Sequence, residues 1–523
     1  MAVYPLYPWK LASAALTATI LTTTAACSEP QVNTPQPEDS PQNVAVNTDQ
    51  DISDIEITDA VNEEFRAAQG VPVDEIQIET NQGVVTLLGT VNNILAKDRA
   101  QRITEMVLGV RSVINRIEVA PSERDDAAIT ADVLTTFAAD PATESWELSA
   151  TTEDGIVTLT GTVDSWQEQQ LATRIAKGIR GVQGIENEID VSYEVFRSDA
   201  EIQEEVERAI EWDARINAGE IDVAVDDGIV TLNGLVGSAY EKSLAVADAY
   251  VAGVRSVDDA ELDVEPGLQN TPSRTTLLSS ATDSDIQNAV TDALLYDPRV
   301  SSFAIDVTVD EGVATLTGTV DNLKSKRAAA QDAANTVGVW HVENNIRVEA
   351  GAEIADERLS SNITEALSRD PYVEAREILV SVNDGVVTLT GVVDSYFEKW
   401  QAGDLAARIA GVVSIDNNLA VDYEQLSFDV DFYDWDPIAN DFDYRQFAKT
   451  DTELANDILD SIYWSPYVET EGVNVSVEDG VATLTGTVET WYERNEATEE
   501  AFEAGASAVV NQLDVNYGPE TSS

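Results

Sequence analysis

The stretch from Asn383 to Gly391 reads NDGVVTLTG, and it decides the fold. Before it, β-branched apolar residues stand at every second position, Ile378, Val380 and Val382, as on the buried face of a strand. Asn-Asp-Gly then supplies residues that tolerate the left-handed backbone of a tight turn, and the alternation resumes at Val387. The stretch is therefore predicted to be the turn and second strand of a β-hairpin.

The same pattern, a Gly followed by two small apolar residues, Thr, Leu, one variable residue and Gly, occurs six times. The intervals between copies are 72 to 95 residues. Repetition at such a period indicates tandem structural modules. The copies begin at Gly83, Gly155, Gly228, Gly312, Gly385 and Gly480.

A first helix is predicted before each hairpin. In copy five, Leu359, Ile363, Ala366 and Leu367 follow helical spacing, and Asp370-Pro371 ends that helix.

A second helix is predicted after each hairpin. Four copies carry Ser/Thr-x-x-Glu, in which the hydroxyl and the carboxylate satisfy helix N-terminal amides reciprocally. These pairs are Ser165 with Glu168, Ser238 with Glu241, Ser395 with Glu398 and Thr490 with Glu493. Copies one and four have Asn93 and Asn322 instead. A Gly is expected where most of these helices end (Gly109, Gly181, Gly253, Gly338 and Gly411), and a third strand follows.

The resulting order, α-β-β-α-β in about 70 residues, resembles the BON domain, named for bacterial osmotically inducible and nodulation proteins. The resemblance implies an α+β fold of six tandem modules, each a three-stranded mixed sheet packed on two helices. Copy three departs from the pattern by lacking a Pro after its first helix, and copy six by Ala506 in place of Val. The predicted modules are 51–120, 124–194, 197–266, 282–350, 354–424 and 450–518, with a linker at 267–281, an insert at 425–449 and a tail at 519–523.

The copies sort into two triplets. Copies one and four, two and five, and three and six share local sequence, for example Val163-Asp164-Ser165-Trp166 and Val393-Asp394-Ser395-Tyr396. This indicates duplication of a three-module block; six independently drifting copies are the alternative.

The N-terminus has the composition of a targeting segment. Residues 1–26 contain an uncharged apolar stretch and read as a signal peptide. Thr24-Ala25-Ala26-Cys27 resembles a bacterial lipoprotein signal, which implies lipidation of Cys27, a tether over 27–50 and an outer-membrane lipoprotein facing the periplasm. The family prefers Leu where Thr24 stands, so a secreted soluble protein is the alternative.

Composition excludes several functions. With 96 Asp plus Glu against 30 Lys plus Arg, the net charge is −66, which argues against binding nucleic acid. A single His341, expected to be structural, and a single Cys27 leave no material for a His-rich zinc site or a disulfide. No catalytic motif is present and no cofactor is expected. The insert, with acids such as Asp429 and Asp431 among aromatic residues, is interpreted as a linker, with calcium binding as the alternative.

Basic residues concentrate in the second helices of copies one and four. The candidates for contact with anionic phospholipid are Lys97, Arg99, Arg102, Lys324, Lys326 and Arg327. Salt bridges to surrounding acids are the alternative role for these side chains.

The BON resemblance implies a non-enzymatic envelope protein that contacts phospholipid or envelope surfaces in envelope maintenance or osmotic stress. The alternative is a periplasmic protein–protein scaffold that uses the Thr residues of the hairpin faces (Thr86, Thr158, Thr231, Thr315, Thr388 and Thr483). The oligomeric state stays open. The acidity itself is interpreted as a solubility adaptation to saline surroundings.

Overall fold

The structure is a computed structural model. It describes residues 52–515 apart from 69, 144–146, 194–196, 267, 269–280, 301–303, 350–353, 422–449, 466–467, 469–471, 479, 489 and 507. Cys27, the rest of the N-terminal segment and the acidic insert lie outside the described residues.

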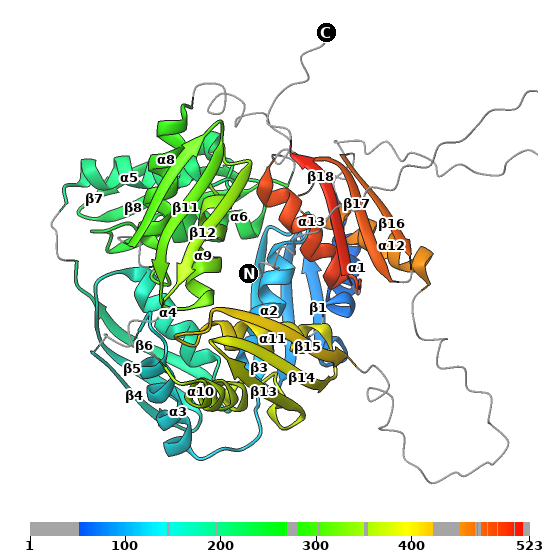
Figure 1. The fold of residues 1–523 in the computed structure, drawn as a ribbon. Coiled ribbons are helices and arrows are strands. Elements are labelled where there is room, and N and C mark those ends of the chain that lie inside the picture. Colours follow the sequence, from blue (N-terminus) through cyan, green and yellow to red (C-terminus); the bar gives the residue numbers. More distant parts are fainter. Residues whose placement is uncertain are drawn as a thin grey trace, which may run out of the picture. The chain divides into compact units, whose positions relative to one another are not determined.

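The predicted fold class is confirmed: six modules repeat the order α-β-β-α-β (Figure 1). Module 1 consists of α1 (Asp54–Ala67), β1 (Ile76–Asn81), β2 (Val84–Val91), α2 (Ile94–Glu105) and β3 (Ser112–Val119). Module 2 consists of α3 (Asp126–Ala139), β4 (Glu147–Glu153), β5 (Ile156–Val163), α4 (Trp166–Lys177) and β6 (Gly184–Val191). Module 3 consists of α5 (Asp199–Trp212), β7 (Ile221–Asp226), β8 (Ile229–Val236), α6 (Ala239–Asp248) and β9 (Ser256–Val264).

The second triplet follows the same order. Module 4 consists of α8 (Asp283–Tyr296), β10 (Ile305–Asp310), β11 (Val313–Val320), α9 (Leu323–Ala334) and β12 (His341–Val348). Module 5 consists of α10 (Asp356–Arg369), β13 (Ile378–Asn383), β14 (Val386–Val393), α11 (Tyr396–Ala407) and β15 (Ser414–Val421). Module 6 consists of α12 (Asp451–Trp464), β16 (Val473–Glu478), β17 (Val481–Val488), α13 (Trp491–Glu503) and β18 (Ala508–Val515).

Each sheet has the hairpin as its first two strands and adds the third strand parallel to the second. The hairpin turn of module 5 has positive φ at both central residues, 49° at Asp384 and 74° at Gly385, as a type I′ turn requires. Along β14, Val387 and Leu389 are fully buried and alternate with partly exposed neighbours, so one face of the sheet carries the core. Burying a Val or Leu side chain contributes about 1.5–3 kcal/mol.

An Asp at the start of the first helix fastens the hairpin turn. In module 5, the Asp356 carboxylate accepts hydrogen bonds from the Asp384 and Gly385 amides at 2.9 and 3.2 Å. The equivalent bond to the turn glycine is made in the other modules by Asp54, Asp126, Asp199, Asp283 and Asp451. The first helix therefore positions the hairpin directly, as well as through packing.

The capping prediction for the second helices is half right. The Ser395 hydroxyl accepts from the Glu398 amide, as expected, but the Glu398 carboxylate bonds the amides of Asp394 and Glu374 rather than that of Ser395. The carboxylate thus ties the loop after the first helix to the start of the second. Reciprocal capping boxes occur instead on first helices, at Ser53, Ser198, Thr282 and Thr450.

The glycines expected to end the second helices lie slightly beyond them. In module 1 the helix ends at Glu105, and Gly109 follows in a separate turn with φ of 91°. The Gly109 carbonyl oxygen lies against the hairpin turn, because a Cβ atom added at Gly83 would be 2.9 Å from it. The glycines therefore close the helix-to-strand connection against the hairpin.

Candidate functional site

The second helices, which carry the candidate residues, lie where modules meet. The first residue of α2, Ile94, packs into the core of module 2, and the equivalent Leu323 of α9 packs against the core of module 5. Ala239 of α6 belongs to the core of module 1. Trp166 of α4 stacks on Tyr250 of module 3, with ring centroids 4.3 Å apart. Every module of the first triplet thus contacts the other two through the start of a second helix.

A second type of contact joins the two triplets in pairs. The donor is the backbone amide of the residue just before the glycine that follows a second helix. The acceptor is the backbone carbonyl of the last residue of a first helix in another module. Leu108 bonds Trp464, Arg180 bonds Arg369 and Val337 bonds Trp212 at 2.7–3.0 Å. The pairs are modules 1 with 6, 2 with 5 and 3 with 4. The same backbone hydrogen bond therefore joins three pairs of modules.

Lys324 lies at the boundary between modules 4 and 5. Its Nζ is 2.5 Å from Asp404 Oδ1 in α11, and Arg408 holds the other carboxylate oxygen at 3.0 Å. Burial lowers the pKa of Lys324 to about 8, against the opposing effect of Asp404. Burial alone would raise the pKa of Asp404, but Lys324 and Arg408 outweigh it and keep that pKa far below its usual range.

Arg99 also contacts another module, because its guanidinium lies 4.7 Å from the ring centroid of Phe397 in module 5. Such a cation–π contact contributes about 0.5–2 kcal/mol. Lys97, Lys326 and Arg327 are half-buried, and burial lowers the pKa of Lys326 and Arg327. Arg102 is exposed. Arg99 and Lys324 therefore contact a neighbouring module, and Arg102 is the most solvent-exposed of the six candidates.

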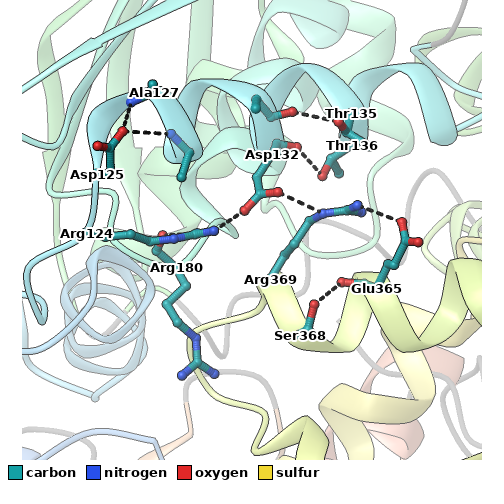
Figure 2. A network of polar contacts seen from close by, with 12 residues as sticks. Arg124, Asp125, Ala127, Asp132, Thr135, Thr136, Arg180, Glu365, Ser368 and Arg369 are labelled. Carbon is teal, nitrogen blue, oxygen red and sulfur yellow. Dashed lines mark hydrogen bonds and ion pairs between the residues drawn. The ribbon is translucent and has the colours of Figure 1, made fainter.

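The sequence interpretation missed a polar network between modules 2 and 5 (Figure 2). The Asp132 carboxylate of α3 lies between Arg124 of its own module and Arg369 of α10, which is 3.2 Å away and also bonds Glu365 at 3.0 Å. Asp132, Glu365 and Arg369 are ordinary residues for a helix surface, and Arg124 lies just before α3. Sequence alone held no signal that α3 and α10 meet.

Modules 3 and 4 contain matching buried clusters that were also missed. Asp213 and Arg215 form a forked ion pair after α5, and Asp297 and Arg299 form the same pair after α8. A second buried acid joins each cluster, Asp248 from α6 and Asp332 from α9. The signal in the sequence is Asp-x-Arg after both first helices.

His341 is the first residue of β12. Its ring packs edge-on against Trp491 of module 6 at 5.4 Å between centroids. Among the described residues, no group of three or more His, Cys, Asp or Glu side chains is arranged to hold a metal ion. Within the same part of the chain, no helix combines the length and apolar character needed to cross a membrane.

Comparison with known proteins gives a family for all six modules. The BON domain model matches residues 53–121, 125–193, 198–266, 282–350, 355–423 and 450–517. Osmotically-inducible protein Y of Escherichia coli (strain K12) is 32% identical over 122 residues, which are 22% of this chain and 61% of that protein. The match thus spans about three fifths of the curated relative.

Two solved structures of the protein CdsD of Chlamydia trachomatis, described as a structural protein of the Type III secretion system, were also found. One covers 43% of this chain and 99% of its own, and the other, a C-terminal domain, covers 39% and 96%; both are 16% identical with a TM-score of 0.12. At that TM-score the likeness supports no argument about function. The six matched ranges take up most of the chain, which therefore belongs to the BON domain family.

Proposed function

We propose that this protein is a non-enzymatic scaffold of the cell envelope, used in osmotic stress, whose modules bind one another through their second helices and present their outer sheet faces to an envelope partner. The signal-like N-terminus supports the location. The likeness to an osmotically inducible protein supports the role in osmotic stress. The observation that carries the proposal is the engagement of the second helices: Ile94, Trp166 and Leu323 all contact a neighbouring module.

The outer sheet faces are the surfaces that these contacts leave open. In module 5 the face carries Leu379, which is 69% exposed, beside Thr390 in the paired strand. Thr388 follows on the same face, across from Asp416 of β15. Helices pack on the opposite face of this sheet, where Val387 and Leu389 are buried.

A photo-crosslinking residue tests this scaffold role. Placed at Thr388 in the full chain, in cells at high osmolarity, it is expected to give an adduct of one defined mass. The matched control is the same residue at Gln401, which bonds Asp370 inside module 5 and is expected to give none. Adducts absent at Thr388 and at the equivalent Thr158 would contradict the proposal.

Direct contact with anionic phospholipid is the second candidate, favoured by Arg102. Its side chain is exposed, and within the described part of the chain it makes no ion pair. Each basic side chain near an anionic surface contributes about 1 kcal/mol. Lys97, Lys326 and Arg327 would add to it, whereas Lys324 and Arg99 are held in other modules.

Vesicle flotation separates the two candidates. A variant with Lys97, Arg102, Lys326 and Arg327 changed to Gln leaves the two inter-module contacts intact. If lipid contact is direct, the full chain without its lipid anchor floats with phosphatidylglycerol vesicles at low salt and the variant does not. Equal flotation of both, or of neither, would contradict lipid contact through these helices. Arg116→Gln, on the exposed face of β3, is the matched control.

A further inference from the structure

Two arginines occupy the same position in the second helices of modules 1 and 2. Arg102 is the ninth residue of α2, and Arg174 is the ninth residue of α4. The two helices are held together by an ion pair one turn away, in which Lys177 Nζ lies 2.7 Å from Asp98 Oδ2. The contact fixes both arginines near the boundary between their modules.

Neither arginine has a direct side-chain partner among the described residues. Over the described residues, neither guanidinium makes a hydrogen bond or an ion pair, and both side chains reach solvent. Arg174 is nevertheless closely surrounded: burial, and next repulsion from Arg299, lower its pKa to about 10, with further repulsion from Arg408 and Arg102. Arg174 thus remains charged at neutral pH.

The neighbouring acids are already occupied. Asp297, whose negative charge opposes the lowering of the Arg174 pKa, accepts from Arg299 at 2.9 Å on both oxygens. Asp404 is shared between Lys324 and Arg408. Burial raises the pKa of Asp140, which lies near Arg408 and Lys324, and so favours its neutral form. Around Arg174 the charge is therefore positive, in a chain whose net charge is −66.

We propose that Arg102 and Arg174 form a binding site for a phosphate-type oxyanion, with Arg299 and Arg408 contributing positive potential from modules 4 and 5. A guanidinium presents two parallel N–H donors that match the oxygens of a phosphate group. The two forks lie on helices that an ion pair joins, and among the described residues neither has an ion-pair partner, so an anion from solution can satisfy both. The site is independent of the sheet faces, so it stands apart from the scaffold proposal.

Inorganic phosphate is the first probe, used with the full chain. Calorimetry is expected to show binding that weakens about tenfold in Arg174→Gln and in Arg102→Gln, a loss of about 1.4 kcal/mol for each fork. The melting temperature gives a second readout. Without phosphate, Arg174→Gln is expected to melt at a higher temperature than the natural protein, because repulsion among four arginines is relieved. Added phosphate is expected to raise the melting temperature of the natural protein only.

A structural role for Arg174 predicts the reverse, with Arg174→Gln melting lower in the absence of phosphate. That result, no heat of binding in the natural protein, or unchanged binding in both Gln variants would overturn the proposal. Arg116→Gln is the control for a general loss of charge. Should Arg174→Gln fail to fold, Arg174→Lys keeps the charge, removes the fork and is expected to bind phosphate more weakly.

Phosphatidylglycerol vesicles form the second arm, because a phosphate group can come from a headgroup or from solution. Vesicle binding that inorganic phosphate displaces, and that Arg174→Gln abolishes, would identify a headgroup as the source. Phosphate binding without vesicle binding would identify a soluble anion. Vesicle binding unaffected by Arg174→Gln and by added phosphate would place lipid contact elsewhere and refute a headgroup at this site.

Discussion

At the residue scale, the bond from Asp356 to the hairpin turn is a direct target. We expect Asp356→Ala to destabilise the protein by about 1 kcal/mol, because the Asp384 and Gly385 amides lose a charged acceptor. Urea unfolding measures the change. Glu357→Ala, at the next exposed position of α10, is the matched control and should be neutral. Equal effects of the two variants would show that the bond contributes nothing.

Lys324 separates a structural role from a lipid-binding one. We expect Lys324→Met to lower the free energy of unfolding by about 3 kcal/mol, because it leaves Asp404 with only Arg408 in a buried boundary. Lys326→Met, two residues along α9, should change stability little, since Lys326 is half-buried without an ion pair among the described residues. If Lys324 served only to contact lipid, both variants would unfold alike.

At the element scale, Arg180 is a test of module pairing. Its Nη2 donates to the carbonyls of Asp370 and Val373 at 2.8 and 2.9 Å, beside the backbone bond from its amide to Arg369. We expect Arg180→Ala to speed hydrogen exchange around 178–182 and 369–374, because those carbonyls lose their donors. Segments containing Leu108 and Val337, which make the same backbone bond in the other pairs, are internal controls. Uniform acceleration would indicate global destabilisation instead.

The order of elements was predictable because its determinants are local. Asp384-Gly385 determines the hairpin turn, and the Ser395 hydroxyl caps α11 by accepting from the amide of Glu398, three residues along the chain. The meeting of modules was not predictable in the same way. Leu323 and Ile94 look like ordinary first residues of amphipathic helices, and only the structure shows that each packs against a neighbour's core. Likewise, the partner of Lys324 lies 80 residues along the chain, with nothing in its local sequence to select it.

At the scale of the whole molecule, the matching acid clusters of modules 3 and 4 predict a pH dependence. Burial, reinforced by Asp213 and Asp297, raises the pKa of Asp248 and Asp332 well above the ordinary value of 3.8. The folded state therefore binds more protons than the unfolded state above that value. Stability should fall as pH rises through the window between the ordinary and the folded pKa, by up to about 1.4 kcal/mol per unit for each group.

The double variant Asp248→Asn/Asp332→Asn tests this, because an amide can still donate to Asp213 and Asp297 but does not titrate. Between about pH 5 and about pH 8 we expect the natural protein to lose stability more steeply than the variant, measured by urea unfolding. Asp370, whose pKa is raised to about 6 mainly by burial, adds a slope of the same sign at the lower end in both proteins. Parallel profiles would mean that the two acids are not protonated in the fold.

Net charge sets the last prediction. The 96 acidic side chains outnumber the 30 basic ones by 66, so 66 negative charges are not balanced by positive ones. Their mutual repulsion acts over about 10 Å at 0.1 M salt and about 3 Å at 1 M. Buried pairs such as Lys324 with Asp404 are screened much less, so added salt should remove more repulsion than attraction.

The urea midpoint should therefore rise as sodium chloride is increased from about 0.01 M to about 1 M. Sucrose at equal osmolality controls for exclusion of solute from the surface. It should raise the midpoint to a similar degree in Lys324→Met and in the natural protein. Salt should instead raise the midpoint of Lys324→Met slightly more, because loss of one Lys takes the net charge from −66 to −67. A midpoint independent of chloride concentration would mean that the acidic surface imposes no strain on the fold, and its explanation as an adaptation to saline surroundings would be wrong.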